Sequence, residues 1–289
     1  MKIITPDKDW NFIMFSKHIQ KLPIDEAAEG IKNAGLAGVD LTVRPGGHVE
    51  PEKVEDDLPR LYEQFKKHGV QVVMLTTEIK SATEPNTEKI VRTASALGIK
   101  YYKTGYFPYR GFGTLAKQRE EVRKALGSLA KLNLKYGITG GYHNHSADFF
   151  GAALWDIYAV LKDLPPAAMG FYFDPAHAMI EGGSKGWIMG MELLADKIVM
   201  VAVKDYCWAK GTHRYAGGRQ HSVEFCPLAS GNVPWDQVID LLQKIGYAGP
   251  VSFHSEYQGG SSFADLTERE VLQQTAKDVA FFKSLIRKT

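Results

Sequence analysis

Eight short apolar segments, each separated from the next by a longer segment, are the feature that most constrains how this chain folds. They occupy residues 12–16, 39–43, 70–77, 99–104, 138–143, 169–174, 198–204 and 250–256. Between them, helical spacing of apolar residues predicts helices at 51–68, 86–97, 114–136, 233–245 and 267–287. Most of these ranges end next to a glycine, which commonly terminates a helix. The repeated order of strand, helix and glycine predicts parallel strands joined by crossover helices.

The number of strands selects among the parallel folds. Eight strand–helix units in 289 residues predict an α/β protein of the (β/α)8 TIM-barrel type, as one domain over residues 1–289. A doubly wound open sheet usually has fewer strands, and its glycine-rich dinucleotide loop is missing from the sequence. Residues 209–234 are predicted to be an irregular, functional loop after the seventh strand. Such a loop would lie over the C-terminal mouth of the barrel, where barrel enzymes carry out their chemistry.

Composition and charge restrict the partners and the location of the protein. Hydrophobic residues make up 44% of the chain, and the formal net charge of +2 gives no electrostatic basis for binding nucleic acid or an anionic membrane. No stretch approaches the roughly 20 apolar residues of a membrane span. The N-terminus lacks the pattern of a signal peptide, and two cysteines are too few for a disulfide framework. A reducing, cytoplasmic location is expected, unless a signal peptide has been removed.

Ionisable residues at the ends of the apolar segments point to the functional end of the barrel. Successive strand residues face opposite sides, so Tyr172 and Asp174 share one side of the sixth strand while Phe171 and Phe173 share the other. The wholly apolar side should meet the helices, which turns Asp174 into the barrel. A buried carboxylate is costly unless a cation or hydrogen-bond donors meet it. Asp174 is therefore predicted to face a partner.

Side chains from the other strands converge on the same rim. The predicted members are His18, Arg44, Glu78, Lys103, His143, His145, Asp174, His177, Lys204, His254 and Glu256. For any one residue, a strand end that becomes polar where it meets water is the simpler interpretation. For the set that interpretation is weak, because solvation alone would not place the clearest cases on the inward side. The rim is therefore the predicted functional site.

The strand ends, taken in order, resemble those of the xylose isomerase-like TIM barrels. This superfamily includes sugar phosphate isomerases and epimerases, inosose dehydratase and the apurinic endonucleases. The matching stretches are GLAGVDL at 35–41, YHNH at 142–145, FDPAH at 173–177, VKD at 203–205 and GPVSFHSE at 249–256. The resemblance implies a small-molecule carbohydrate as substrate. Because members often form dimers or tetramers, it is also compatible with a homo-oligomer.

The resemblance implies a metal site with unusual ligands. In the family's epimerases, one divalent metal ion sits between Glu, Asp, His and Glu side chains on strands five to eight. Asp174 matches the Asp, whereas the other three positions correspond to His143, Ala202 and His254. A set of His143, Asp174 and His254, with Glu256 replacing or supplementing His254, would suit Mn²⁺, Fe²⁺, Co²⁺ or Zn²⁺. The alternative is a metal-free site in which these groups only form hydrogen bonds.

The reactions of such sugar enzymes begin with removal of a proton from the carbon next to a carbonyl. Glu256 or Lys204 is expected to exchange that proton, because a desolvated lysine can act as a base near neutral pH. Lys204 could instead form an ion pair with Asp174, which would keep the carboxylate charged.

Five further residues are expected to bind the substrate. They are His177, Arg44, His145, Lys103 and Trp208. His177 lies on the family's substrate-binding position and would hold a hydroxyl group. Arg44 would grip a carboxylate or phosphate, and the ring of Trp208 would stack on the apolar face of a sugar.

Three kinds of function compete at this point. The first is a sugar, sugar-phosphate or polyol isomerase or epimerase, with a lyase of the inosose dehydratase type as a close alternative. The second is a non-catalytic carbohydrate-binding barrel. The third is a DNA repair nuclease, which the near-neutral charge and the small number of acidic rim residues disfavour.

Overall fold

A closed barrel of eight parallel strands forms the body of the molecule. The computed structural model describes residues 10–215 and 218–286, without the side chains of residues 210–221. The barrel strands are β1 (Asn11–Phe15), β2 (Gly38–Val43), β3 (Gln71–Thr77), β4 (Tyr101–Lys103), β5 (Thr139–His143), β6 (Met169–Phe173), β7 (Ile198–Val203) and β10 (Pro250–Phe253). They follow one another around the barrel in chain order, and β10 closes it by pairing with β1. The predicted α/β TIM barrel and its eight strands are confirmed. The prediction of one domain over 1–289 includes residues outside the described ranges and stays a prediction.

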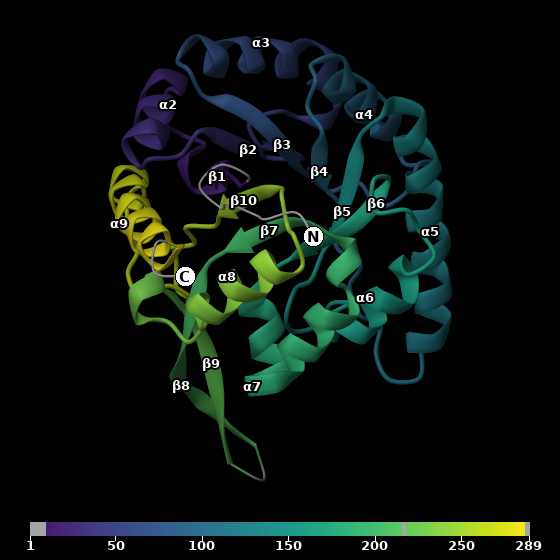
Figure 1. Ribbon diagram of the computed structural model, residues 1–289, viewed down its shortest axis with the longest axis vertical. Coiled ribbons are helices and arrows are strands. Elements are labelled where there is room, and N and C mark those ends of the chain that lie inside the picture. Colours follow the sequence, from purple (N-terminus) through teal and green to yellow (C-terminus); the bar gives the residue numbers. More distant parts are fainter. Residues whose placement is uncertain (1–9, 216–217, 287–289) are drawn as a thin grey trace.

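Helices surround the strands, as Figure 1 shows. They are α2 (Ile24–Asn33), α3 (Val54–Lys67), α4 (Thr87–Ala96), α5 (Leu115–Tyr136), α6 (Leu154–Leu161), α7 (Pro175–Leu193), α8 (Trp235–Lys244) and α9 (Glu268–Ile286). Short 3-10 helices are η1 (Ser16–Ile19), η2 (Pro51–Lys53), η3 (Ala195–Lys197) and η4 (Leu228–Ser230). The five predicted helices are present, while α2, α6 and α7 lie outside the predicted ranges. In the described part of the chain, no helix is long and apolar enough to span a membrane.

The segment after β7 corrects one prediction, because most of it is an antiparallel hairpin rather than an irregular loop. Strands β8 (Asp205–Tyr215) and β9 (Gly218–Cys226) pair with each other, and the hairpin extends beyond the ring of helices (Figure 1). Near its base Tyr206 lies opposite Phe225, and such aromatic cross-strand pairs stabilise a two-stranded ribbon. The free thiols of Cys207 and Cys226 also meet across the base, with 2.9 Å between their Sγ atoms.

Strand parity behaves as predicted in β6. Phe171 and Phe173 belong to the large core between strands and helices, whereas Tyr172 belongs to a small cluster inside the barrel. Ala202 of β7 lies in the same interior cluster. Since alternate residues face opposite sides, Asp174 at the end of β6 is directed to the inside of the barrel mouth.

The loop before α8 is fixed by the Asp205 carboxylate at the start of the hairpin. Its Oδ1 accepts hydrogen bonds from the backbone N–H groups of Tyr206 (2.8 Å), Asn232 (2.8 Å) and Val233 (3.0 Å). Its Oδ2 accepts one from the indole N–H of Trp235 at 2.8 Å. This carboxylate therefore joins the base of the hairpin to the start of α8.

Gly231 passes so close to Asp205 that a side chain does not fit there. A Cβ atom at Gly231 would overlap the carboxyl group of Asp205, which is held by several donors. We expect Gly231→Ala to lower the free energy of unfolding by about 1–3 kcal/mol, as overpacking of an ordered site does. Urea unfolding measures this, with Gly260→Ala as the control because nothing lies within 4 Å of a Cβ there. Equal stability of the two variants would contradict the expectation.

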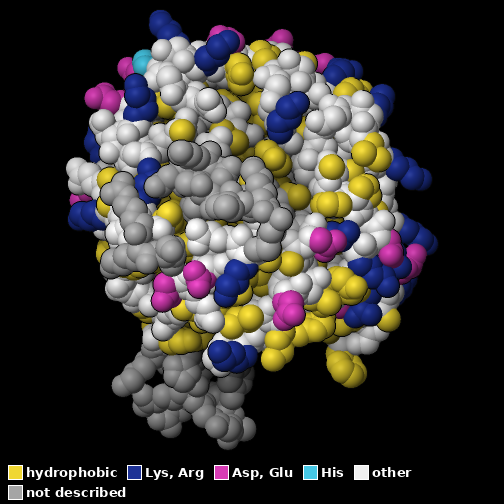
Figure 2. All heavy atoms as spheres, in the orientation of Figure 1, with side chains coloured by type: hydrophobic (Ala, Val, Ile, Leu, Met, Phe, Trp, Pro, Cys, Tyr) yellow, Lys and Arg dark blue, Asp and Glu magenta, His cyan; other side chains and the backbone are white. Residues whose placement is uncertain are grey.

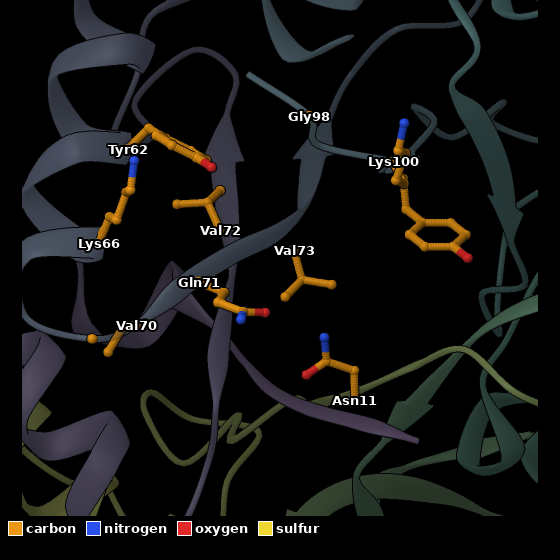
Figure 3. A pocket seen from close by; sticks show the side chains of 11 residues that line it. Asn11, Tyr62, Lys66, Val70, Gln71, Val72, Val73, Gly98 and Lys100 are labelled. Atoms are coloured by element: carbon orange, nitrogen blue, oxygen red, sulfur yellow. The ribbon is translucent and has the colours of Figure 1, made fainter. Parts of the chain in front are cut away.

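A cavity at the N-terminal ends of the strands is not the candidate site. It has a volume of about 560 Å³ and lies between α3 and the starts of β1, β3 and β4 (Figure 3). Its titratable side chains are those of Tyr62, Lys66, Lys100 and Tyr101. Because (β/α)8 enzymes place their chemistry at the opposite end, this cavity lies at the end associated with stability. On the face shown in Figure 2, basic and acidic side chains are interspersed, in keeping with the near-neutral net charge.

Candidate active site

Asp174 is held rigidly where β6 passes into α7. It is the N-cap residue of α7, and its Oδ1 accepts a hydrogen bond from the backbone N–H of His177 at 3.0 Å. The side chain of Asn144 brackets its backbone, donating to the carbonyl of Asp174 (2.9 Å) and accepting from its N–H (2.8 Å). Pro175 at the first helical position favours the turn into the helix. These contacts direct the fully buried Oδ2 of Asp174 toward the centre of the mouth.

The ammonium group of Lys204 lies at the centre of the site. Its Nζ is 3.4 Å from Asp174 Oδ2, 3.0 Å from Glu256 Oε1 and 2.7 Å from His177 Nε2. The ion pair between Lys204 and Asp174, which was the alternative to a proton-exchanging lysine, is thus present. The phenyl ring of Phe225, from β9, lies 4.9 Å from the same Nζ. We call Lys204, Asp174, Glu256 and His177 the lysine cluster.

The charges of the lysine cluster stabilise one another. Burial opposes the charge on Lys204, but Glu256 and Asp174 outweigh it and raise its pKa. Burial alone would raise the pKa of Asp174, yet Lys204 and the neighbouring histidines hold it well below its ordinary value. The pKa of Glu256 is lowered in the same way, mainly by Lys204 against the effect of burial. At neutral pH the cluster therefore contains one ammonium and two carboxylates.

The histidine in the lysine cluster is neutral. Burial and the nearby Lys204 lower the pKa of His177 well below its ordinary value. Since an ammonium group can only donate, Lys204 donates to His177 Nε2 and the ring proton sits on Nδ1, which is 2.9 Å from the hydroxyl of Ser146. The ring of His145 stacks on that of His177 with 4.0 Å between centroids. The predicted substrate residues His177 and His145 thus form one wall of the site.

Two further histidines lie beside the cluster and are tied to tyrosines. His143 Nδ1 is 2.6 Å from the hydroxyl of Tyr106, and burial lowers its pKa to about 3. His254 Nε2 is 2.7 Å from the hydroxyl of Tyr172, and its ring lies 4.5 Å from that of Phe15. Sequence reasoning missed these tyrosine contacts. The parity that turns Tyr172 inward is the signal that could have found one of them.

The other rim residues are dispersed. Lys103 is buried and its Nζ lies 3.7 Å from the centre of the Tyr106 ring, in a small cavity that Arg44 and Glu78 also line. His18 is buried against Gln258, to which its Nδ1 hydrogen-bonds at 2.9 Å. Trp208 is 49% exposed on the hairpin, with its ring against that of Tyr206. Arg44 and Lys103 therefore come together, whereas Trp208 projects from the hairpin.

The buried carboxylate of Asp40 is a part of the mouth that the predicted rim left out. It accepts hydrogen bonds from Thr76 (2.8 Å) and Ser252 (3.2 Å), and its Oδ2 is 4.0 Å from His254 Nε2. Burial raises its pKa. The inward parity of β2 could have included it, because Asp40 alternates with outward-facing Val39 and Leu41.

Two of the three expected metal ligands lie close together, but the third is engaged elsewhere. Among the described residues, His143 Nε2 and Asp174 Oδ2 are buried without a hydrogen-bond partner and lie 3.3 Å apart, a separation that two ligands of one ion could have. The third expected ligand, His254, is engaged by Tyr172. The ammonium of Lys204, 3.4 Å from the same Asp174 oxygen, would repel a divalent cation. Within the described ranges, no group of three or more His, Cys, Asp or Glu side chains is arranged to hold a metal ion. The three-residue set therefore does not fit a metal ion as it is arranged.

The loop that carries Arg44 contains a histidine suited to a test of pH dependence. His48 Nδ1 is 3.0 Å from the hydroxyl of Thr42 and 3.3 Å from that of Ser16, and burial lowers the pKa of His48 to about 4. The unfolded chain binds this proton near pH 6.5. Between pH 6.5 and 4 the unfolded state therefore binds more protons, and the free energy of unfolding falls as the pH falls.

We expect His48 to contribute up to about 2 kcal/mol to the loss of stability between pH 6.5 and 5, at about 1.4 kcal/mol per pH unit. Urea unfolding at both pH values should show a smaller loss for His48→Gln than for the wild type. The exposed His68 provides the control, since His68→Gln should retain the wild-type loss. An unchanged pH dependence in His48→Gln would contradict the assignment.

Comparisons with known proteins agree with this architecture. The model of a protein family described as xylose isomerase-like TIM barrel matches residues 28–285. The structure of 3-keto-D-glucoside 4-epimerase from E. coli is similar, with a TM-score of 0.68, 16% identity, and coverage of 95% of this chain and 99% of that one. D-allulose 3-epimerase from Methylomonas sp., in complex with D-allulose, gives a TM-score of 0.68, 15% identity, and coverage of 96% and 97%.

A third similar structure contains a metal ion. It is a xylose isomerase-like TIM barrel protein from Mycobacterium smegmatis in complex with magnesium, with a TM-score of 0.66, 17% identity, and coverage of 94% of this chain and 91% of that one. No curated protein matches the sequence. Sequence identities of 15–17% show only that these structures share the fold of this chain. The family model is independent of them and matches nearly the whole chain. This chain belongs to the xylose isomerase-like TIM barrel family.

Proposed function

We propose that this protein is a sugar isomerase or epimerase that removes a proton from the carbon next to a carbonyl group. One observation supports this most strongly. A buried ammonium, that of Lys204, contacts two carboxylates and a neutral imidazole at the C-terminal mouth of the barrel. Enolate formation needs a base and a positive group beside the oxygen that becomes negative. The lysine cluster contains both.

Glu256 is the proposed base. Its side chain is 20% exposed, whereas those of Lys204 and Asp174 are at most 3% exposed, so Glu256 is the more accessible carboxylate of the cluster. It takes the proton from the carbon, and the electron pair of the C–H bond moves to form the enolate oxygen anion. For isomerisation, the proton of the hydroxyl on that carbon moves to the former carbonyl oxygen, and Glu256 returns its proton to the former carbonyl carbon. For epimerisation, Glu256 releases its proton to solvent, and a proton from water adds to the opposite face of the original carbon.

Lys204 is the proposed partner of the enolate oxygen. Among the described residues, Asp174 Oδ2 has no hydrogen-bond donor, so the third N–H of Lys204 is not committed to it at 3.4 Å. A substrate oxygen can accept that N–H. When the ammonium turns toward the enolate oxygen, its interaction with Glu256 weakens. The pKa of Glu256 then rises, and the carboxylate becomes a stronger base. The carboxylate of Asp174 keeps Lys204 charged and in position, and His177 accepts a hydrogen bond from the same ammonium group.

A divalent metal ion remains the second arrangement. It is favoured by the unpartnered pair of His143 Nε2 and Asp174 Oδ2, and by the magnesium in the similar Mycobacterium smegmatis structure. The expected ions are Mn²⁺, Fe²⁺, Co²⁺ or Zn²⁺, with His143, Asp174 and His254 as ligands. Binding of such an ion would require Lys204 to move away from Asp174 and Tyr172 to release His254.

The test is exchange of hydrogen between substrate and solvent. The protein is incubated in D₂O with a panel of ketoses, aldoses, ketoglucosides and their phosphates, and incorporation of deuterium is followed by NMR. Incorporation next to a carbonyl, with conversion to an isomer or epimer, is expected for at least one sugar. Loss of water from the product would instead indicate a dehydratase. Binding without exchange across the panel would favour a non-catalytic carbohydrate-binding barrel.

A further inference from the structure

A small basic cavity lies beside the lysine cluster, at the ends of β2, β3 and β4. Its volume is about 160 Å³, enough for a phosphate or carboxylate group, and its lining comprises Arg44, Glu78, Lys80, Lys103, Gly105 and Tyr106. Three of these side chains are basic and one is acidic. The lining therefore has a local excess of positive charge, whereas the chain as a whole is nearly neutral.

Lys103 is the buried cation of this cavity. The residue is 3% exposed, and its Nζ donates a hydrogen bond to the carbonyl of Thr104 at 2.8 Å and lies over the ring of Tyr106 at 3.7 Å. Within the described part of the chain, no carboxylate is within ion-pair distance of Lys103. An ammonium has three N–H donors, and burying it without an anion is costly. Burial and the nearby Arg44 lower the pKa of Lys103 to about 7, and a bound anion would raise it again.

The cavity is connected to the reactive side chains through two aromatic rings. Tyr106, under Lys103, has its hydroxyl 2.6 Å from His143 Nδ1. The guanidinium of Arg44 lies 5.9 Å from the centre of the Phe15 ring, which in turn contacts the ring of His254. A substrate whose anionic group lies between Arg44 and Lys103 would therefore pass over these rings to reach the lysine cluster.

We propose that Arg44 and Lys103 form a subsite for the anionic group of the substrate. The substrate class is then a sugar with a terminal phosphate or carboxylate, whose carbonyl end reaches Lys204 and Glu256. This assignment rests on the proposed function. Arg44 supplies a planar fork for two oxygens of the anion, and the buried Lys103 supplies a point charge.

The test is binding by the intact chain, measured calorimetrically with inorganic phosphate, acetate, glucose 6-phosphate, glucuronate and glucose. Phosphate or acetate should bind, and the corresponding anionic sugar should bind at least tenfold more tightly than glucose. Preference for glucose 6-phosphate identifies a phosphate subsite, and preference for glucuronate a carboxylate subsite. Arg44→Gln and Lys103→Met should each reduce anion binding at least tenfold, whereas Arg60→Gln, an exposed site on α3, should leave it within twofold.

Two results would overturn the proposal. One is that no anion binds at millimolar concentration. The other is that anions bind equally to the wild type and to Arg44→Gln, which lies on a surface loop and is expected to fold even if Lys103→Met does not. These results do not depend on catalysis. Deuterium exchange with a neutral sugar and no anion binding would refute the subsite but leave the proposed reaction intact. Anion binding without deuterium exchange on any sugar would refute the proposed reaction but leave the anion site intact.

Discussion

Replacing Lys204 with methionine is expected to abolish activity and to destabilise the protein more than any other single change at the mouth. The change removes the only ammonium that contacts Asp174 and Glu256 among the described residues, and leaves the buried carboxylate of Asp174 and the partly buried carboxylate of Glu256 without it. Removing one partner of a buried ion pair typically costs about 3–5 kcal/mol. Loss of the donor at a developing negative charge should reduce the exchange rate by about 100-fold or more.

A second buried lysine provides the control for this change. Lys197, in η3, is 7% exposed, and its Nζ donates to the carbonyl of Leu164 at 3.0 Å and lies 3.5 Å from the exposed Asp196. Lys197→Met should cost less stability, because the carboxylate left behind is in water, and should leave exchange unchanged. Urea unfolding and deuterium exchange are measured for both variants. If Lys204→Met behaves like Lys197→Met in both measurements, the central role of Lys204 is wrong.

Replacing Glu256 with glutamine is expected to have the second largest effect, and to separate catalysis from folding. The amide keeps an oxygen that can accept the hydrogen bond of Lys204, while Asp174 still balances the ammonium. Stability should therefore change by about 1 kcal/mol or less, as for an exchange of one hydrogen-bond acceptor for another. The amide cannot take a proton, so the exchange rate should fall about 10²–10⁴-fold.

Glu181→Gln is the matched control, because Glu181 is an exposed glutamate of α7 whose Oε1 accepts a hydrogen bond from the backbone of Ala147 near the same mouth. Its exchange rate should stay close to that of the wild type. Full activity in Glu256→Gln would show that another group, such as His143, removes the proton.

The barrel and the inward side of its rim could be predicted from the sequence because both depend on local periodicity. Alternation along β6 was enough to direct Asp174 inward, and the glycines after the helices marked the repeats. The hairpin was missed because residues 209–234 have no clear helical or apolar pattern. Its pairing depends on cross-strand contacts, such as that of Tyr206 with Phe225, which join residues distant in sequence.

The side-chain partners at the mouth could be predicted only where residue types left few choices. An ion pair of Lys204 with Asp174 was one such case. Two contacts depend on how separate strands meet in space. They are the hydrogen bond between Tyr172 and His254 and the contact of the Lys204 ammonium with the ring of Phe225. The same limit applies to the metal site. The residue types alone favoured His143, Asp174 and His254 as metal ligands. The ammonium of Lys204 beside Asp174 disfavours a divalent ion there.

The most direct test of the lysine-centred site is deuterium exchange by chelator-treated protein, with its metal content checked by elemental analysis and the responsive sugar of the panel as substrate. We predict that metal-depleted wild-type protein still exchanges the hydrogen next to the carbonyl and that Lys204→Met does not. Exchange that stops on chelation, returns with Mn²⁺ or Zn²⁺ and persists in Lys204→Met would contradict this account and place a metal ion on Asp174 instead.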